Sequence, residues 1–237
     1  MYQEVSNQLK RYAKNKKALE SSRFFKTGKG EYSEGDLFIG VSNPNIRKIA
    51  KENKDLEFKT VEHLINSKIH DERLCGLFIL VEKYTKAKDP QLKLSVVSVY
   101  LKNLSGVNNW DLVDLTAYKI LGDYIYNYSK DYKILYKLAK SKNIWERRIS
   151  ILTTFYFIKQ RQCKHTLKIA KMLLDDKEDL IHKAVGWMLR EVGKNCGEKV
   201  LEDFIKQNYD QMPRTTLRYS IERFDEKKRI KFLKKLY

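Results

Sequence analysis

The sequence predicts an all-α fold, and three observations support this prediction. Apolar residues recur at three- and four-residue spacing in almost every segment after Ser42, and no stretch shows sustained strand-like alternation. Only three prolines occur, Pro44, Pro90 and Pro213, and each stands at or near an expected helix start, where a missing N–H costs nothing. The third observation is that helix starts recur at a regular interval along the chain.

The most secure helix starts have a capping residue ahead of apolar periodicity and recur every 33 to 37 residues, near Asp71, Asn108, Asn143, Asp179 and Met212. Second helices are expected between them, beginning near Asp89, Asp131, His165 and Gly197. The Trp, Gly and Tyr positions of tetratricopeptide repeats are absent. We therefore expect a right-handed α-solenoid of short HEAT-like helix pairs, with a concave basic face that suits a cylindrical ligand such as duplex DNA.

We expect one domain over residues 1–237, with N-terminal helices and a Gly-rich loop in residues 1–41 and the repeat array in residues 42–237. Four of the ten glycines, Gly28, Gly30, Gly35 and Gly40, fall within thirteen residues of this loop. The loop lacks the GxxxxGK[ST] spacing of a nucleotide P-loop, so phosphate binding by its backbone is the weaker alternative. We interpret it as a connector.

The charge balance indicates a polyanionic partner, because 48 Lys and Arg against 30 Asp and Glu leave a formal charge of +18. A membrane surface is the competing polyanion, but no apolar run approaches the roughly 18 to 20 residues that span a bilayer. The first residues also lack the apolar stretch of a secretory signal. We therefore expect an intracellular, cytoplasmic protein that associates with DNA and not with membranes.

Neither the cysteines nor the histidines form a recognisable ligand pattern. The cysteines are odd in number, widely spaced and without a CxxC pair: Cys75, Cys163 and Cys196. The histidines show no HxxxH spacing: His63, His70, His165 and His182. We expect reduced core cysteines, incidental histidines, no metal and no cofactor.

The segment from about Glu178 to Lys194 predicts an amphipathic helix with a tryptophan among cations. Its core face comprises Ile181, Ala184, Val185, Met188, Leu189 and Val192. Lys183, Arg190 and Lys194 all lie within about 60° of Trp187 on the helical wheel. The ring either packs at the edge of the core or contacts nucleic acid, whose phosphates the cations would hold.

The segment NNWDLVDLTAYKILG predicts a helix with Trp110, Asp114, Ala117 and Leu121 on one face, so Trp110 and Asp114 can address one ligand. Asp111 lies in the first turn, where capping and the helix dipole explain it. Asp114 is therefore the better functional candidate, and its alternative is a surface carboxylate or a salt-bridge partner.

Arg148 is the third candidate, because it falls at the centre of an apolar stripe and needs an anionic partner there. The stripe is made by Ile144, Trp145, Ile151, Leu152 and Phe155. The partner is either a carboxylate such as Asp114, in a structural pair, or a DNA phosphate. We favour a role in which Arg148 serves both.

Taken together, these segments resemble the AlkD-type DNA alkylation repair glycosylases, which are built of HEAT-like repeats. The resemblance covers nearly the whole chain and rests on FFKTGKGEYSEGDLFIGV, NNWDLVDLTAYKILGDYI, NIWERRISILTTFYFI, LIHKAVGWMLREVGK and QMPRTTLRYSIERF. It implies base excision repair by a glycosylase of the 3-methyladenine/7-methylguanine type, which hydrolyses the N-glycosidic bond of N3- or N7-alkylated purines in duplex DNA without flipping the base.

The resemblance also implies roles for four residues. Asp114 would be the catalytic carboxylate, Trp110 and Trp187 would contact the sugar, and Arg148 would help to grip the DNA. The sequence departs from the family pattern in the Gly-rich N-terminal insertion and in Asn109, where some members carry another tryptophan. Both departures bear on substrate range.

Two other classes of function remain as alternatives: a non-catalytic DNA-binding solenoid, and a HEAT-like protein scaffold or RNA-binding factor. Asp114 argues against the first, because a carboxylate facing phosphates lowers the affinity of a simple DNA binder. We expect a monomer without an obligate protein partner.

Overall fold

The computed structural model describes all 237 residues, and its regular elements are all helices, apart from one isolated β-bridge between Leu37 and Ile69. The all-α prediction is therefore confirmed. The chain divides into two compact units, Met1–Thr116 and Ala117–Tyr237. The expected single domain and the expected solenoid both depend on how these two units combine, and both stay predictions.

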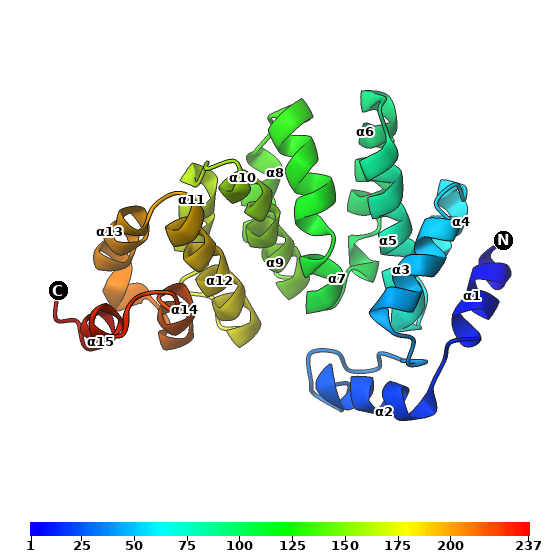
Figure 1. Cartoon of the computed structure of the whole chain (residues 1–237), viewed down its shortest axis with the longest axis horizontal. Helices are drawn as coiled ribbons and strands as arrows, with labels where there is room; N and C mark the ends of the chain where they lie inside the picture. Colours follow the sequence, from blue (N-terminus) through cyan, green and yellow to red (C-terminus); the bar gives the residue numbers. More distant parts are fainter. The chain divides into compact units, whose positions relative to one another are not determined.

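The helices of the first unit are α1 (Tyr2–Lys10), α2 (Asn15–Phe24), α3 (Asn43–Glu52), α4 (Phe58–Ile65), α5 (His70–Lys86), α6 (Pro90–Lys102) and α7 (Trp110–Asp114) (Figure 1). Helix α5 is the centre of this unit and packs against α3, α4, α6 and α7. Neighbours on several sides explain why α5 is buried on every face from His70 to Val81. Leu74, Leu77 and Ile79 are among its core residues.

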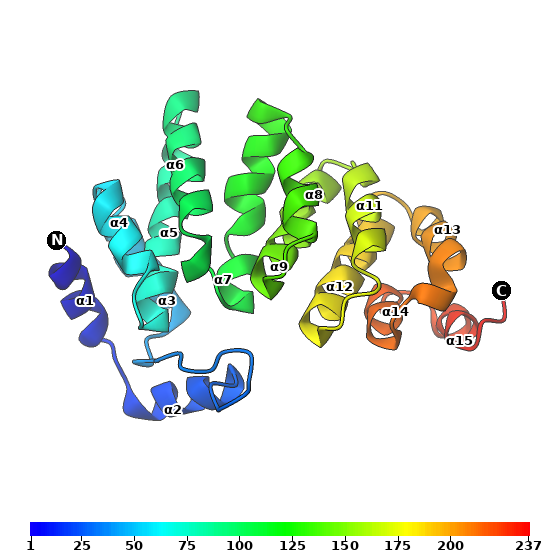
Figure 2. The ribbon, with the colours of Figure 1, turned by 180° about the vertical axis from the view of Figure 1, so that it is seen from behind.

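Helix α2 differs from its neighbours because none of its side chains is buried. Figures 1 and 2 show it lying across the ends of the other helices of this unit. Backbone contacts hold its start, where the Lys14 N–H donates to the Ile39 carbonyl at 3.1 Å. Gly40 permits this approach, since it has a φ of +79° and a Cβ there would lie 2.4 Å from the Lys14 oxygen.

The helices of the second unit are α8 (Lys133–Ala139), α9 (Ile144–Thr153), α10 (Phe155–Lys159), α11 (Lys164–Met172), α12 (Asp179–Asn195), α13 (Glu198–Asn208), α14 (Arg214–Ser220) and α15 (Glu226–Lys234). Helix α12 is the centre of this unit and packs against α9, α13 and α14. Gly186 allows α14 to come close, because a Cβ on Gly186 would lie 2.5 Å from the Tyr219 Cβ.

Most of the predicted helix starts are confirmed to within a few residues. Asp89 caps α6 by accepting from the Gln91 N–H, and Asn143 caps α9 by accepting from the Trp145 N–H. The core face predicted for residues 178–194 is buried in full in α12. Asn109, and not Asn108, caps α7. No helix combines the length and the apolar character that crossing a membrane requires.

Two local features differ from the expectations. The helix expected from Asn108 to Gly122 ends at Asp114 and is followed by π-helical turns at Tyr118–Gly122 and Ile125–Ser129. All three cysteines are free, but only Cys75 is buried, because Cys163 and Cys196 lie at helix ends and are half-buried.

Candidate functional site

A cavity of about 480 Å³ lies within the first unit, where α2, the Gly-rich loop, α5 and α7 meet. Its aromatic lining consists of Phe24, Phe25, Phe38 and Trp110. Its ionisable lining consists of Asp71, Asp111, Asp114, Lys17 and His70. The cavity therefore combines flat apolar walls with carboxylates, and it includes two of the residues that the sequence singled out.

Helix α7 brings Trp110 and Asp114 together on this cavity. Asn109 starts the helix with its side-chain oxygen, which accepts from the Trp110 N–H at 2.8 Å. Because residues four apart stand above one another on a helix, Asp114 follows one turn after the tryptophan. The Trp110 indole Nε1 donates to the Tyr32 hydroxyl at 3.3 Å. Both candidates are half-buried and line one space.

The ring of Trp110 is oriented by phenylalanines that precede the Gly-rich loop. Phe25 stacks on it with ring centres 5.0 Å apart and planes 19° apart. Phe24 meets the same ring edge-on at 5.8 Å and 72°. Phe38, from the end of the loop, stacks in turn on Phe25 at 5.1 Å. The loop connects α2 to α3, as expected, and it also contributes Phe38 to the lining of the cavity.

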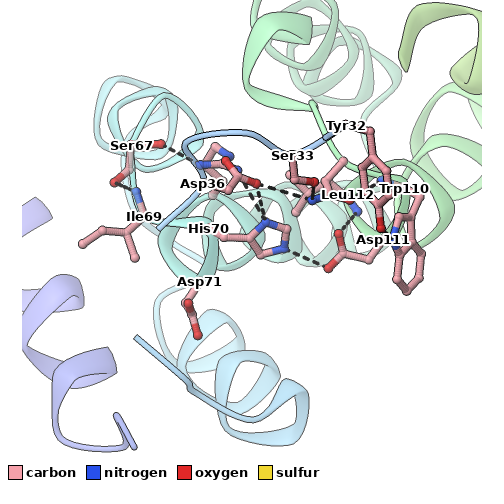
Figure 3. Close-up of polar contacts among 12 residues, drawn as sticks. Tyr32, Ser33, Asp36, Ser67, Ile69, His70, Asp71, Trp110, Asp111 and Leu112 are labelled. Carbon is pink, nitrogen blue, oxygen red and sulfur yellow. Dashed lines mark hydrogen bonds and ion pairs between the residues drawn. The ribbon is translucent and has the colours of Figure 1, made fainter. Parts of the chain in front are cut away.

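His70 lies beneath these rings and joins two carboxylates (Figure 3). Its Nε2 lies 2.9 Å from Asp111 Oδ2 and its Nδ1 lies 3.2 Å from Asp36 Oδ2. The side chain of His70 is only 3% exposed, and Phe38 stacks on its ring at 4.4 Å. Arg73 also pairs with Asp36, at 2.6 Å. The expectation that His70 is incidental was therefore wrong.

The pKa values of this network follow from its geometry. Burial acts to lower the pKa of His70, but the charge and hydrogen bond of Asp111, helped by the bond to Asp36, raise it overall. Burial acts in the opposite direction on Asp36, whose pKa is nevertheless lowered by the hydrogen bond from His70 and the charge of Arg73. The geometry favours an imidazolium held between two carboxylates.

Further hydrogen bonds fasten the Gly-rich loop to the helices. Asp71 accepts from the Val41 N–H at 2.7 Å and from the Ile39 N–H at 3.0 Å. The Asn109 amide donates to the Ser33 hydroxyl at 2.7 Å. A tryptophan at position 109 would lack this donor. Asn109 therefore anchors the Gly-rich loop to the start of α7.

Asp111 serves both the helix start and the network. Its Oδ1 accepts from the Leu112 N–H at 2.9 Å, which agrees with a role in the first turn. Its Oδ2 is the partner of His70, which is 41 positions away. No local pattern in the sequence signals that second role, and the same is true of Asp36.

The second unit holds the other candidates. Arg148 is 5% exposed in α9 and donates from Nη1 to the Leu180 carbonyl. A backbone oxygen is thus one of its partners, and the carboxylate or phosphate that the sequence suggested stays a prediction. Trp187 is half-buried on α12, and its ring centre lies 5.7 Å from that of Phe155.

The cations near Trp187 on α12 differ in their partners. Lys183 pairs with Asp179 at 2.8 Å, whereas Arg190 pairs with Glu222 and, at 3.5 Å, with Glu191. Lys194 is exposed. A hollow of about 800 Å³ lies beside the first two cations and mixes both signs of charge, with a lining of Asp179, Lys183, Arg190, Thr215, Arg218, Tyr219, Glu222, Glu226 and Arg229.

Comparisons with known proteins show which family and which solved structure this chain resembles. The sequence matches the family described as "DNA alkylation repair enzyme" over residues 5–224. The fold is similar to a solved structure described as a predicted DNA alkylation repair enzyme from Enterococcus faecalis, with a TM-score of 0.70, 16% identity, and coverage of 91% of this chain and 98% of that one. No curated protein matches the sequence. The chain belongs to the DNA alkylation repair enzyme family.

Proposed function

We propose that this protein is a DNA glycosylase that hydrolyses the N-glycosidic bond of purines alkylated at N3 or N7 in duplex DNA. Membership of the family supports a role in DNA alkylation repair. The observation that carries the more specific proposal is the placement of Asp114 one helical turn from Trp110, on the lining of one cavity.

One carboxylate suffices for this chemistry. A purine alkylated at N3 or N7 is already cationic, so it departs as a neutral base and needs little help from a general acid. The deoxyribose becomes oxocarbenium-like as the bond breaks, and an anion near C1′ stabilises that charge and orients the attacking water. We assign this role to Asp114.

Asp111 is unsuited to the same role. One of its oxygens pairs with His70 and the other accepts from the Leu112 N–H. A carboxylate engaged in this way stabilises charge less well at a reacting sugar, because its negative charge is already partly balanced. Its position supports a part in holding α7 against α5.

Aromatic and basic residues complete the proposal. The electron-rich face of Trp110 adds cation–π stabilisation to the sugar, typically about 0.5 to 2 kcal/mol. We propose the same contact for Trp187, and contacts with the DNA backbone for Arg148, Lys183, Arg190 and Lys194. The formal charge of +18 supports binding to a polyanion.

The proposal is tested by incubating the protein with duplex DNA that contains 7-methylguanine and measuring the free base released. Asp114→Asn should lower the rate about 10²- to 10³-fold, as expected for loss of one preorganised electrostatic group. Its DNA affinity should stay equal or rise slightly, since an anion is removed from a site near phosphates.

Asp55→Asn is the matched control, because it removes the same charge from a side chain that is 85% exposed and lies outside the cavity. It should release base at the wild-type rate. DNA binding by the wild-type protein without any release of base would replace this proposal with a non-catalytic DNA-binding protein of the same fold.

A further inference from the structure

Helices α8 and α11 of the second unit each carry lysines with the same spacing. In both, a lysine recurs after four and then after three residues, so the three side chains fall within about 60° of one another around the helix. All six side chains are exposed. These two sets, called the lysine rows below, are Lys133, Lys137 and Lys140 of α8 and its C-cap, and Lys164, Lys168 and Lys171 of α11.

Each lysine row lies opposite the buried face of its helix. The buried side chains are Leu135, Leu138 and Ala139 in α8, and Thr166, Ile169 and Ala170 in α11. At about 100° per residue, the centre of each buried face lies about 180° from the row on the same helix. The two helices contact each other and lie side by side, while α8 packs on α9, and α11 on α9 and α12 (Figure 2). Both rows therefore belong to one outer surface, which faces away from α9 and α12.

The spacing of the lysine rows matches the charge density of a duplex. The ring of Tyr132 stacks on that of His165 at 3.9 Å, and the Tyr136 hydroxyl lies 2.7 Å from His165 Nδ1, so α8 and α11 are held together. Packed helices lie about 8 to 10 Å apart, and each row extends about 10 Å along its helix. Duplex DNA carries one phosphate per about 1.7 Å of its axis, which gives about six phosphates over the length that the six lysines cover.

The positive charge of this surface is not balanced by carboxylates. Residues 130–172 contain 12 Lys and Arg against 2 Asp and Glu, and so hold more than half of the formal charge of +18. None of the six lysines pairs with a carboxylate, whereas Lys183 and Arg190 of α12 do. Asp131, which precedes α8, accepts from the Lys133 backbone N–H at 3.0 Å. A polyanion can therefore bind the lysine rows without breaking an ion pair.

The same surface is poorly suited to a membrane. A helix that lies on a lipid surface presents large apolar residues beside its cations. Met172, which is 37% exposed, is the one large apolar side chain that α8 and α11 expose. The chemistry of the lysine rows is therefore that of phosphate binding without an apolar contact, as at a nucleic-acid backbone.

We propose that the lysine rows bind the phosphates of a second DNA duplex, so that one protein molecule holds two duplexes. The rows face away from α12, whose cations we assign to the first duplex. A duplex is stiff over about 150 base pairs, so a short one cannot bend around the helices to reach both surfaces. The second duplex needs no damage, because phosphate contacts carry no information about the base.

The test counts duplexes per protein molecule. An undamaged duplex of about 12 base pairs, about 40 Å long, is mixed in excess with the full chain at low salt, and the mass of the complex is measured by sedimentation velocity. The wild-type protein should bind two duplexes. Binding of the second should raise the pKa of His165 in an NMR titration, because burial and then the charges of Lys164 and Lys168 hold that pKa below its ordinary value.

A triple variant of α8 locates the second duplex. Replacing Lys133, Lys137 and Lys140 with glutamine keeps the helix propensity and removes three charges. It should weaken binding of the second duplex at least about tenfold and lower the slope of log affinity against log salt by about 2 to 3. Release of 7-methylguanine should stay at the wild-type rate, since these lysines lie outside the cavity.

A triple variant of α15 is the matched control. Lys227, Lys231 and Lys234 have the same spacing and are exposed, so replacing them with glutamine removes the same charge. Lys228 of this helix pairs with Glu198 and Glu202 of α13, so carboxylates lie beside the α15 lysines. The control variant should still bind two duplexes.

One duplex per wild-type molecule, equal losses in the α8 and α15 variants, or tighter binding of the lysine rows to phosphatidylserine vesicles or to single-stranded RNA than to the duplex would each overturn the inference. The assay uses undamaged DNA and does not depend on base release. Two bound duplexes without release of 7-methylguanine would leave the second duplex site and overturn the glycosylase. Release by a protein that binds only one duplex would do the reverse.

Discussion

Replacing His70 with glutamine should destabilise the first unit by about 3 kcal/mol. Removing one partner of a buried ion pair typically costs about 3 to 5 kcal/mol, because the other charge is left buried. We expect the lower end here, since Asp36 keeps Arg73 at 2.6 Å and only Asp111 loses its charged partner. For a chain of this length, about 3 kcal/mol corresponds to a Tm lower by roughly 6 to 12 °C.

This cost should depend on pH in a definite direction. The pKa of His70 is raised in the folded protein, so the imidazolium stabilises the fold fully below its ordinary value of 6.5. The contribution is lost as the pH rises through the higher pKa of the folded state. His70→Gln should therefore cost most near pH 6 and clearly less near pH 9.

Urea unfolding followed by circular dichroism at the two pH values measures both effects. His63→Gln is the control, because His63 is exposed and stacks on Tyr2 at 4.0 Å without a buried carboxylate. It should change the free energy of unfolding by less than about 0.5 kcal/mol at either pH. A His70→Gln cost that is the same at pH 6 and pH 9 would refute the buried imidazolium.

Three further predictions concern the acid limit, the Gly-rich loop and the basic surface of α12. Because the pKa of Asp36 is lowered from 3.8, its contribution to stability is complete above that pH and is lost as the pH falls. Asp36→Asn should therefore make the stability depend less on pH in the acid range, as measured by acid unfolding followed by circular dichroism. Gly40→Ala should speed tryptic cleavage within α2, since the added Cβ would lie 2.4 Å from a backbone oxygen. Gly30→Ala is the control, because Gly30 has a similar φ but no atom within 4 Å of the added Cβ, so it should speed cleavage less. Equal cleavage rates in the two variants would argue against the steric cause. Glu222→Gln should strengthen binding to undamaged duplex, because it removes the Glu222 partner of Arg190 and leaves only the 3.5 Å pair with Glu191. Arg190→Gln should weaken binding and reduce its salt dependence, and an equal effect of both variants would exclude Arg190 as a phosphate contact.

Local patterns in the sequence were enough to predict the helices and several of their ends. The core face of α12 is one example, because a period of 3.6 residues places Ile181, Ala184, Val185 and Met188 on one side whatever that side packs against. The caps at Asp89 and Asn143 are others, since a capping side chain contacts an N–H only two residues away. The pairing of Trp110 with Asp114 rests on the same short-range geometry.

The surroundings of that pair were decided only by the tertiary structure. Asp36 lies 34 positions before His70 and Asp111 lies 41 positions after it, so no local pattern relates the three. The same holds for Phe25, which stacks on a tryptophan 85 positions away. The sequence by itself determined the helices, the positive charge and the face shared by Trp110 and Asp114. Folding decided which ionisable groups were buried together and which rings enclose the cavity, because burial and pairing depend on segments that meet only in three dimensions.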